Sequence, residues 1–406
     1  MIQRTLFLNR IRPFVGTDVI KVITGMRRSG KSVFLDQIQT ELRRSNPQAK
    51  IFALRLDDDA NRRFLSKGVL FEHVESLLRE ANGEMVHLFF DEIHDVEGWE
   101  TAVNSLRMRP NADLYLTGSN SQLLSGELAT YLTGRYVEIS ISPFSFTEFL
   151  EAAHPLFPSE NTEQLFNRYL LTGGIPFLAK VGYDAEACRS YLQDLYNAIL
   201  LKDVVRRKQI RDADLLDRVV RFAMTECGHT FSARSLVAFL KNEHRKTSVE
   251  TILNYLTACE EAFLITRVPR NDLVGKRILN VEEKYYVTDT GLRNTIVQGN
   301  LRRDIDRLLE NVVYCELLRR GYQVSVGKMK KQEIDFVCDK GSQRLYVQVA
   351  FTVGSEETRE REFSALEALK ANGQKLLLTL DHLDFSDGAI RHQYLPDFLL
   401  NQAGHP

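Results

Sequence analysis

Short apolar runs separated by longer amphipathic stretches mark the chain between residues 19 and 141. The apolar runs, which are candidate strands, are Val19–Thr24, Ile51–Leu56, Val86–Phe90, Leu114–Thr117 and Tyr136–Ile141. The stretches between them allow helices that return the chain by right-handed crossovers. This alternation predicts an α/β core in which helices cover a parallel sheet, and Pro143 closes the region.

From about Thr147 to Lys208 the pattern becomes mostly helical, with one interruption. The interruption is Gly173-Gly174-Ile175-Pro176, and a helix does not pass comfortably through two glycines followed by a proline. We therefore expect two helices to meet at this point.

The stretch between Tyr196 and Asn280 is the clearly basic part of the chain, with 15 Lys/Arg against 10 Asp/Glu. Its elements are expected to be two helices followed by two strands, at Ser232–Leu240, Ser248–Leu256, Phe263–Val268 and Arg277–Val281. Two helices and a hairpin are the layout of a winged helix. The second helix would then enter a DNA major groove, while Arg245, Lys246, Arg267 and Arg270 would hold phosphates. An equally open alternative is that this module packs against the α/β core of its own chain or against another subunit.

The last hundred or so residues predict a compact unit with the element order αβββαβ. A helix is expected at Leu301–Arg320, because its apolar positions recur every three or four residues, and Gly321 ends it. The following strands, helix and strand are expected at Gln323–Val326, Glu333–Cys338, Leu345–Phe351, Glu356–Ala371 and Lys375–Leu380.

Composition limits the class of protein. The chain has 406 residues, of which 44% are hydrophobic and 26% charged, and this balance predicts two to four globular domains. The net charge of −1 excludes a general attraction to polyanions. Five scattered cysteines form no metal or disulfide pattern. The N-terminus lacks a signal-peptide pattern and no later segment is apolar enough to span a membrane, so we expect a cytoplasmic protein with no membrane partner.

Gly25-Met26-Arg27-Arg28-Ser29-Gly30-Lys31-Ser32 matches the P-loop pattern GxxxxGK[ST] between a predicted strand and a predicted helix. Such a loop points backbone N–H groups at phosphate oxygens, and the positive end of the next helix adds to the attraction. Lys31 is expected to reach the β- and γ-phosphates, and the Ser32 hydroxyl to bind Mg²⁺. The residues expected to bind the nucleotide are Gly25, Arg28, Ser29, Gly30, Lys31, Ser32 and Val33.

Two adjacent carboxylates, Asp91 and Glu92, follow the apolar strand Val86–Phe90. Carboxylates at the end of a buried strand are costly unless a cation meets them. We expect Asp91 to hold Mg²⁺, directly or through water, and Glu92 to polarise the attacking water. The glutamate favours ATP hydrolysis over transfer of phosphate to a small-molecule acceptor.

Polar residues also follow the fourth predicted strand, and an arginine precedes the fifth. Thr117, Ser119 and Asn120 would lie beside the γ-phosphate if the fourth strand neighbours the first, which makes them sensor candidates. Arg135 is a candidate catalytic finger that stabilises phosphoryl charge in a neighbouring subunit. A surface arginine with a structural partner explains it equally well.

The order of these motifs resembles the AAA+ ATPases, and in particular the bacterial and archaeal group with a DUF4143-type C-terminal region. The matching segments are Asp91–His94, Gly98–Glu100, Thr117–Ser119, Gly134-Arg135, Pro143–Phe149, Gly173–Pro176, Lys202-Asp203, Lys284–Tyr286, Asp289–Leu292, Glu310-Asn311 and Glu333–Phe336. The resemblance implies that Pro176 lies against the nucleotide base. His94 stands where that group usually has glutamine.

The αβββαβ order resembles restriction-endonuclease-like domains, which gather a helix acid, a strand aspartate and a Glu/Gln-x-Lys around Mg²⁺. The resemblance places these roles on Glu310, Asp335 and Gln348, but Ala350 stands where the lysine is expected. An inactive, nuclease-like fold used for contacts is therefore the favoured interpretation.

The sequence as a whole predicts a multidomain α/β protein. Its expected parts are an AAA+ core at 1–146, a helical lid at 147–208, a winged helix at 209–295 and a nuclease-like domain at 296–406. The expected activity is Mg²⁺-dependent ATP hydrolysis that drives a switch or remodeller, with DNA, a protein partner or a second copy as candidate partners. The alternatives are an ATP-gated DNA nuclease that uses the C-terminal domain and a nucleotide-sensing adaptor with negligible turnover.

Overall fold

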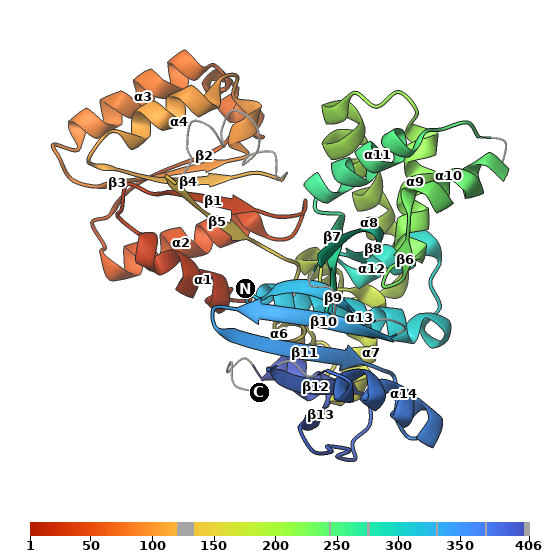
Figure 1. Ribbon diagram of the computed structural model, residues 1–406. Helices are drawn as coiled ribbons and strands as arrows, with labels where there is room; N and C mark the ends of the chain where they lie inside the picture. The colour runs from red at the N-terminus through yellow and green to blue at the C-terminus, as the bar shows by residue number, and fades with distance from the viewer. Residues whose placement is uncertain (120–133, 243–244, 274–276, 330–331, 370–371, 402–406) are drawn as a thin grey trace. The chain divides into compact units, whose positions relative to one another are not determined.

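The computed structural model describes residues 1–119, 134–242, 245–273, 277–329, 332–369 and 372–401. Two compact units are present. The first comprises Met1–Ser142 together with Glu261–Phe263, and the second comprises Pro143–Glu260 and Leu264–Pro406. Figure 1 shows the chain coloured from red at the N-terminus to blue at the C-terminus.

The first unit is built on a five-stranded sheet with the order β2-β3-β4-β1-β5, in which every neighbouring pair is parallel. The strands are β1 (Ile20–Thr24), β2 (Lys50–Arg55), β3 (Val86–Asp91), β4 (Ala112–Thr117) and β5 (Tyr136–Ser140). The predicted core is thus confirmed strand by strand. Because β4 lies between β3 and β1, the C-terminal ends of all three meet at one edge.

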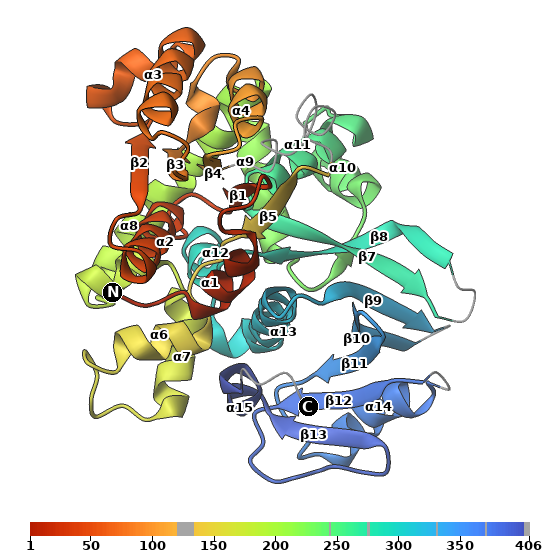
Figure 2. The same cartoon turned by 90° about the vertical axis from the view of Figure 1, so that its left-hand side faces the viewer.

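Helices cover both faces of this sheet (Figures 1 and 2). The helices α1 (Thr5–Ile11) and α2 (Lys31–Ser45) pack on one face through Phe7, Phe34 and their neighbours. The helices α3 (Lys67–Glu80) and α4 (Trp99–Arg107) pack on the opposite face of the sheet through Leu70, Trp99 and neighbouring apolar residues. The central strands are buried on both sides, which is why their sequences are continuous apolar runs. The 3₁₀ turns η1 (Arg12–Phe14), η2 (Asp59–Leu65) and η3 (Ile93–Asp95) complete this unit.

Helices begin the second unit, and those before Lys208 lie in the stretch that the sequence predicts to be mostly helical. The helices are α6 (Phe146–Ala153), α7 (Thr162–Thr172), α8 (Ala185–Ala198) and α9 (Ala213–Thr225), with a 3₁₀ helix η5 (Pro176–Val181) and a π-helical turn η6 (Ile199–Arg206). A reciprocal capping box starts α6 at Ser145 and Glu148, and another starts α7. The glycine pair ends α7, and Pro176 begins η5, as predicted.

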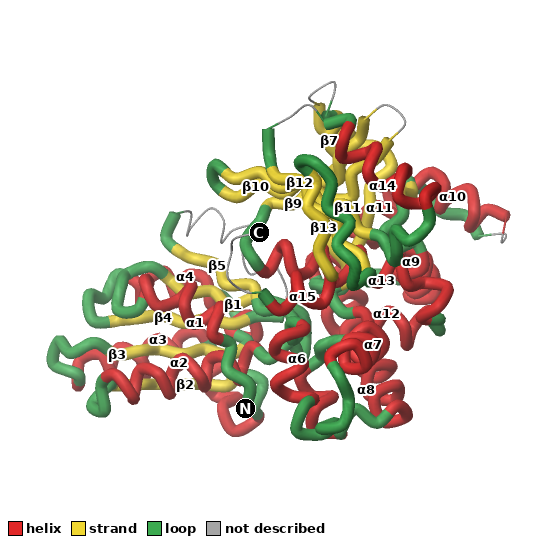
Figure 3. Tube along the Cα trace, turned by 90° about the horizontal axis from the view of Figure 1, so that it is seen from below, coloured by secondary structure: helices red, strands yellow, loops and turns green. Residues whose placement is uncertain are grey.

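The second unit also contains an eight-stranded sheet in the order β13-β12-β11-β10-β9-β7-β8-β6 (Figure 1). Figure 3 shows its strands in yellow beside helices in red. The strands are β6 (Thr230–Phe231), β7 (Ile265–Asp272), β8 (Arg277–Val287), β9 (Gln323–Met329), β10 (Gln332–Lys340), β11 (Gln343–Val349), β12 (Gln374–Thr379) and β13 (Ile390–Tyr394). The remaining helices are α10 (Ala233–Asn242), α11 (Val249–Glu261), α12 (Thr290–Val297), α13 (Leu301–Arg319), α14 (Glu356–Glu367) and α15 (Leu395–Leu400). The predicted αβββαβ order is present, and β13 and α15 extend it.

One feature of this sheet was not predicted from the sequence. The hairpin β7–β8, expected to be the wing of a separate module, pairs in parallel with β9 at Arg270–Asp272 and so continues into the strands of the C-terminal region. A parallel pairing between segments so far apart in sequence leaves no local signal, because only the final contact defines it.

Candidate functional site

The P-loop curls between β1 and α2 with three residues in the left-handed region, Gly25, Arg28 and Gly30. A Cβ atom at Gly25 would lie 2.2 Å from the carbonyl oxygen of Ile141, so only glycine fits there. Gly30 is the N-cap of α2, whose positive end therefore faces the loop. The local geometry is that of a phosphate-binding loop.

Lys31, the first residue of α2, is 5% exposed and turns back over its own loop. Its ammonium donates to the carbonyl oxygens of Gly25 at 3.0 Å and Met26 at 3.2 Å. The hydroxyls of Ser29 and Ser119 are buried and have no hydrogen-bond partner in the described part of the chain. Buried polar groups normally have partners, so orphaned hydroxyls at this place fit a polar ligand such as a nucleotide phosphate. Ser32 is partly buried and Val33 is exposed.

The two carboxylates after β3 meet the end of β4. Thr117 donates its hydroxyl hydrogen to Asp91 and accepts the backbone N–H of Glu92 at 2.9 Å. The Glu92 carboxylate lies 3.9 Å from the Lys31 ammonium and accepts the backbone N–H of Ser119 at 3.2 Å. The predicted residues Lys31, Asp91, Glu92, Thr117 and Ser119 are therefore gathered at one edge of the sheet.

Glu92 is held in the left-handed region at φ 57°. A non-glycine residue rarely adopts this conformation without a functional or structural reason. Nδ1 of His94 lies 3.3 Å from the second oxygen of Glu92. His94 is thus a neighbour of the catalytic candidate, a position that the sequence comparison alone did not establish. Asn120 lies outside the described residues.

Arg135 lies at the opposite end of the sheet from the P-loop. Its carbonyl oxygen accepts the N–H of Ile20, the first residue of β1, whereas the P-loop follows the last residue of that strand. Five residues of extended chain, about 16 Å, separate these two ends. The exposed side chain has no polar partner among the described residues. Arg135 therefore does not lie beside the P-loop of its own chain.

The glycine turn before Pro176 forms a tight contact within the second unit. The buried carboxylate of Asp289 caps α12 at Leu292 and accepts the N–H of Gly174 at 2.7 Å. A Cβ atom would come within 2.2 Å of Asp289 at Gly173 and within 1.9 Å of the Thr172 carbonyl oxygen at Gly291. Two separate motifs of the resemblance, Gly173–Pro176 and Asp289–Leu292, therefore form one structural contact.

The basic residues proposed for DNA are largely engaged within the chain. Arg245 pairs with Asp214, and Arg267 with Glu260 and Glu283. Arg270 is 5% exposed and pairs with Glu333 at 2.9 Å. The expectation that Arg270 holds a DNA phosphate is wrong, because the residue is buried under β9 and β10. Lys246 is exposed.

The three candidates of the nuclease-like region come together, and two groups that the sequence did not predict, Lys284 and Glu333, join them. Lys284 of β8 places its ammonium 2.8 Å from Glu333, 3.4 Å from Glu310 and 3.9 Å from Asp335. Asp335 lies at an irregularity between β10 and β9, where a bulge redirects side chains. Gln348 accepts the N–H of Asp335 at 3.3 Å.

The charges of this group are buried. Burial and the nearby Glu310 raise the pKa of Asp335 well above its usual value, and burial also raises the pKa of Glu310. Burial by itself lowers the pKa of Lys284, but the surrounding carboxylates outweigh it and raise that pKa. In the described part of the chain, no set of three His, Cys, Asp or Glu side chains has the arrangement of a metal site. The cation at the centre of this cluster is the lysine.

Family comparisons agree with the geometry of the first unit. Residues 17–150 match an AAA domain, and residues 163–304 match a domain of unknown function, DUF8612, rather than the DUF4143-type region that the sequence resembled. An uncharacterized protein of Haemophilus influenzae is 36% identical over 401 residues, covering 98% of this chain and 99% of that protein. An uncharacterized protein of Methanocaldococcus jannaschii is 29% identical over 86% of this chain and 78% of its own length.

A solved structure shares the fold. A Walker-type ATPase of Pyrococcus abyssi superposes with a TM-score of 0.51 at 14% identity, over 73% of this chain and 96% of that one. At this identity the likeness concerns the fold alone. Among the described helices, none combines the length and the apolar character that crossing a membrane requires.

Proposed function

Since this chain belongs to the same protein family as its Haemophilus influenzae relative and carries an AAA domain at residues 17–150, we propose that it is an Mg²⁺-dependent ATPase. Its turnover would drive a switch or remodelling step. The observation that carries the proposal is the contact of Thr117 with both Asp91 and Glu92 beside Lys31.

Each residue has a distinct role in this proposal. Lys31 would leave the loop carbonyls for the β- and γ-phosphates, and Ser32 and Asp91 would hold Mg²⁺. The metal would neutralise charge that develops on the phosphates. Glu92, held by Thr117 and Ser119, would orient and polarise the attacking water. The buried hydroxyls of Ser29 and Ser119 supply further donors for phosphate oxygens.

We propose that the helical part of the second unit responds to nucleotide binding. Pro176 begins η5 directly after the turn that Asp289 holds, and we propose that it lies against the nucleotide base. A change at Pro176 would then reach α12 and β8 through Asp289, because the turn and the cap share one carboxylate. Arg135 would complete the site from a neighbouring copy.

The C-terminal cluster is proposed to serve contacts rather than phosphodiester cleavage. Lys284 occupies the point on which Glu310, Glu333 and Asp335 converge, so a cation of the chain itself already lies among these carboxylates. Cleavage of DNA that requires a divalent metal and disappears in Asp335→Ala would overturn this part and support the nuclease alternative.

The decisive experiment is steady-state ATP hydrolysis by the full chain, with Glu92→Gln and Lys31→Ala as controls. We expect Lys31→Ala to lose nucleotide binding, and Glu92→Gln to keep binding while turnover falls by about a hundredfold. Turnover that is unchanged in Glu92→Gln, together with tight ATP binding, would instead identify a nucleotide-sensing adaptor. Turnover by Lys31→Ala at the wild-type rate would refute the site.

The same assay performed with duplex and single-stranded DNA separates the partner classes. Stimulation by DNA would support action on nucleic acid through α11 and Lys246. Indifference to DNA would favour a protein partner, in keeping with the internal ion pairs of Arg245, Arg267 and Arg270.

A further inference from the structure

A pocket of about 550 Å³ lies within the second unit, between α7, the beginning of α8 and α12. Cavities of this size are typical of sites for small organic molecules. Its lining includes none of the nucleotide motifs, and neither the ATPase proposal nor the family comparisons assign it a role.

Three polar groups that line this pocket have no partner in the described part of the chain. The Tyr183 hydroxyl is buried and makes no hydrogen bond. Asn167 on α7 and the exposed guanidinium of Arg189 on α8 likewise make no hydrogen bond or ion pair with any described residue. The buried Tyr183 hydroxyl favours a polar ligand, because buried polar groups ordinarily find partners, and the partly exposed Asn167 and exposed Arg189 are unengaged groups on the same cavity.

The charge of the lining selects the kind of ligand. Its one acid, Glu160, is already neutralised by a two-contact ion pair with Arg168. Arg189 therefore adds an uncompensated positive charge. Burial raises the pKa of Tyr183, so its hydroxyl stays protonated and can donate. A guanidinium with neutral donors beside it is the group of residues that binds carboxylates and phosphates.

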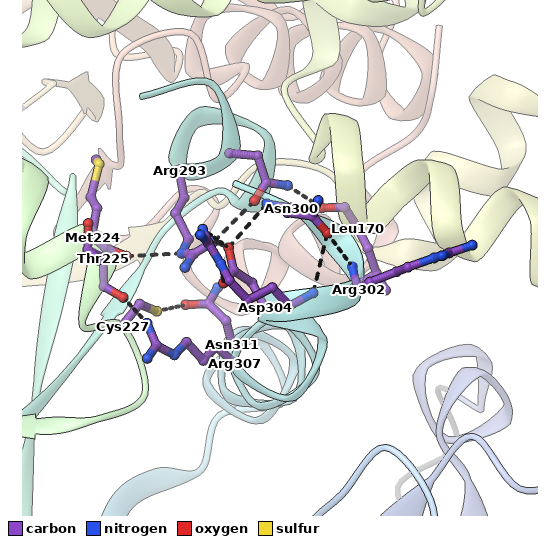
Figure 4. A network of polar contacts seen from close by, with 12 residues as sticks. Leu170, Met224, Thr225, Cys227, Arg293, Asn300, Arg302, Asp304, Arg307 and Asn311 are labelled. Carbon is purple, nitrogen blue, oxygen red and sulfur yellow. Dashed lines mark hydrogen bonds and ion pairs between the residues drawn. The ribbon is translucent and has the colours of Figure 1, made fainter. Parts of the chain in front are cut away.

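The pocket wall is already formed. Asn294 of α12 donates to the carbonyl oxygens of Leu170 and Leu171, which fixes α12 against the end of α7. Behind it, the buried Arg293 donates to the carbonyl oxygen of Met224 and pairs with Asp304 (Figure 4). A site built on anchored helices requires little rearrangement when its ligand enters.

We infer that this pocket binds a small organic anion, whose carboxylate or phosphate group is held by Arg189 with Tyr183 and Asn167 as neutral donors. The site is independent of the proposed ATPase activity. A ligand here would also touch Thr172, the residue before the glycine turn that leads to Pro176.

The test is titration calorimetry on the full chain, saturated with ADP and Mg²⁺ so that anions cannot report on the P-loop. The probes are succinate and glycerol 3-phosphate, with sodium chloride at matched ionic strength as the blank. We expect at least one probe to bind, and Arg189→Gln and Tyr183→Phe each to weaken its binding by about tenfold. Which probe binds distinguishes a carboxylate ligand from a phosphate ligand.

Controls make each outcome informative. Arg234→Gln changes an equally exposed arginine on α10 and should leave binding unchanged. Lys31→Ala, titrated without nucleotide, should still bind the probe. Asn167→Ala offers a second variant on a partly exposed helix position, should Tyr183→Phe fail to fold. Absence of binding by both probes, or binding that Arg189→Gln and Asn167→Ala leave unchanged, would overturn the inference. A chain that binds the anion but hydrolyses no ATP would refute the proposed function alone.

Discussion

Gly174 donates its backbone N–H to the buried carboxylate of Asp289 at 2.7 Å, across 115 residues of sequence. The same carboxylate caps α12. One side chain therefore joins the turn that precedes Pro176 to the segment between β8 and α12.

The titration of the Asp289 carboxyl group should be visible in the pH dependence of the free energy of unfolding. Burial raises its pKa to about 6, above the 3.8 expected of an exposed aspartate. The folded chain therefore holds a proton that the unfolded chain releases, so Asp289 makes stability fall as pH rises from about 4 to about 6, by up to about 3 kcal/mol. Above that window its contribution is constant.

Asp289→Asn removes this titration. The cost of the substitution in unfolding free energy should accordingly be largest near pH 4 and shrink as pH rises to 6, when measured by urea denaturation. Asp184→Asn, which alters an exposed N-cap of α8, is the matched control. A cost that is equal at all pH values would contradict the assignment.

Gly291→Ala should destabilise the second unit by about 3 kcal/mol, because the new Cβ would press on a backbone carbonyl that cannot move freely. Gly68→Ala, where nothing lies within 4 Å of the added atom, should be close to neutral. Thermal unfolding of both variants measures the difference. Equal midpoints would mean that the turn is looser than the contact with Thr172 implies.

Thr117→Val should reduce kcat for ATP by roughly ten- to a hundredfold while leaving the Kd for ATP almost unchanged, because the hydroxyl orients Asp91 and Glu92 rather than the phosphates. Thr117→Ser should recover much of the loss. Thr40→Val, on the exposed side of α2, controls for the removal of a hydroxyl. A rise in Kd with kcat intact would assign Thr117 to nucleotide binding instead.

Arg135→Ala should lower turnover by about a thousandfold if this residue acts as a finger in a neighbouring copy. A mixture of the Arg135→Ala and Glu92→Gln chains should then turn over ATP well above the sum of the rates of the two variants alone. The Arg135→Ala copy supplies the intact Glu92 and P-loop, and the Glu92→Gln copy supplies the arginine. A mixture that stays inactive would show that Arg135 has no role across subunits.

Lys284→Met should cost about 3–5 kcal/mol of unfolding free energy, since it removes the cation beside the buried Asp335 and the partly buried Glu310 and Glu333. Lys241→Met, at an exposed position on α10, should change stability little. Chemical denaturation distinguishes them. If Lys284→Met proved as stable as wild type, the cluster would not depend on its lysine.

Local sequence determined the nucleotide site and most of the elements. Gly25–Ser32 and Asp91-Glu92 are contiguous motifs whose chemistry follows from backbone geometry over a few residues, so their positions could be predicted. The strands of the first unit and the αβββαβ order were equally accessible, because burial on both faces produces apolar runs and helices produce a regular period. Glu310 and Asp335 were also placed correctly as neighbours.

Only the tertiary structure decided which distant charges meet. Lys284 reaches Glu310, Glu333 and Asp335 because β7 pairs with β9. That pairing also buries Arg270, which the sequence analysis predicted to bind a DNA phosphate. The Asp289 contact and the pocket beside Arg189 likewise bring together segments more than a hundred residues apart. A charged residue has the same local pattern whether it faces solvent, a ligand or another side chain. Its partner is set by the packing of the whole unit, where burial makes an unpaired charge costly and therefore selects the pairs that remain.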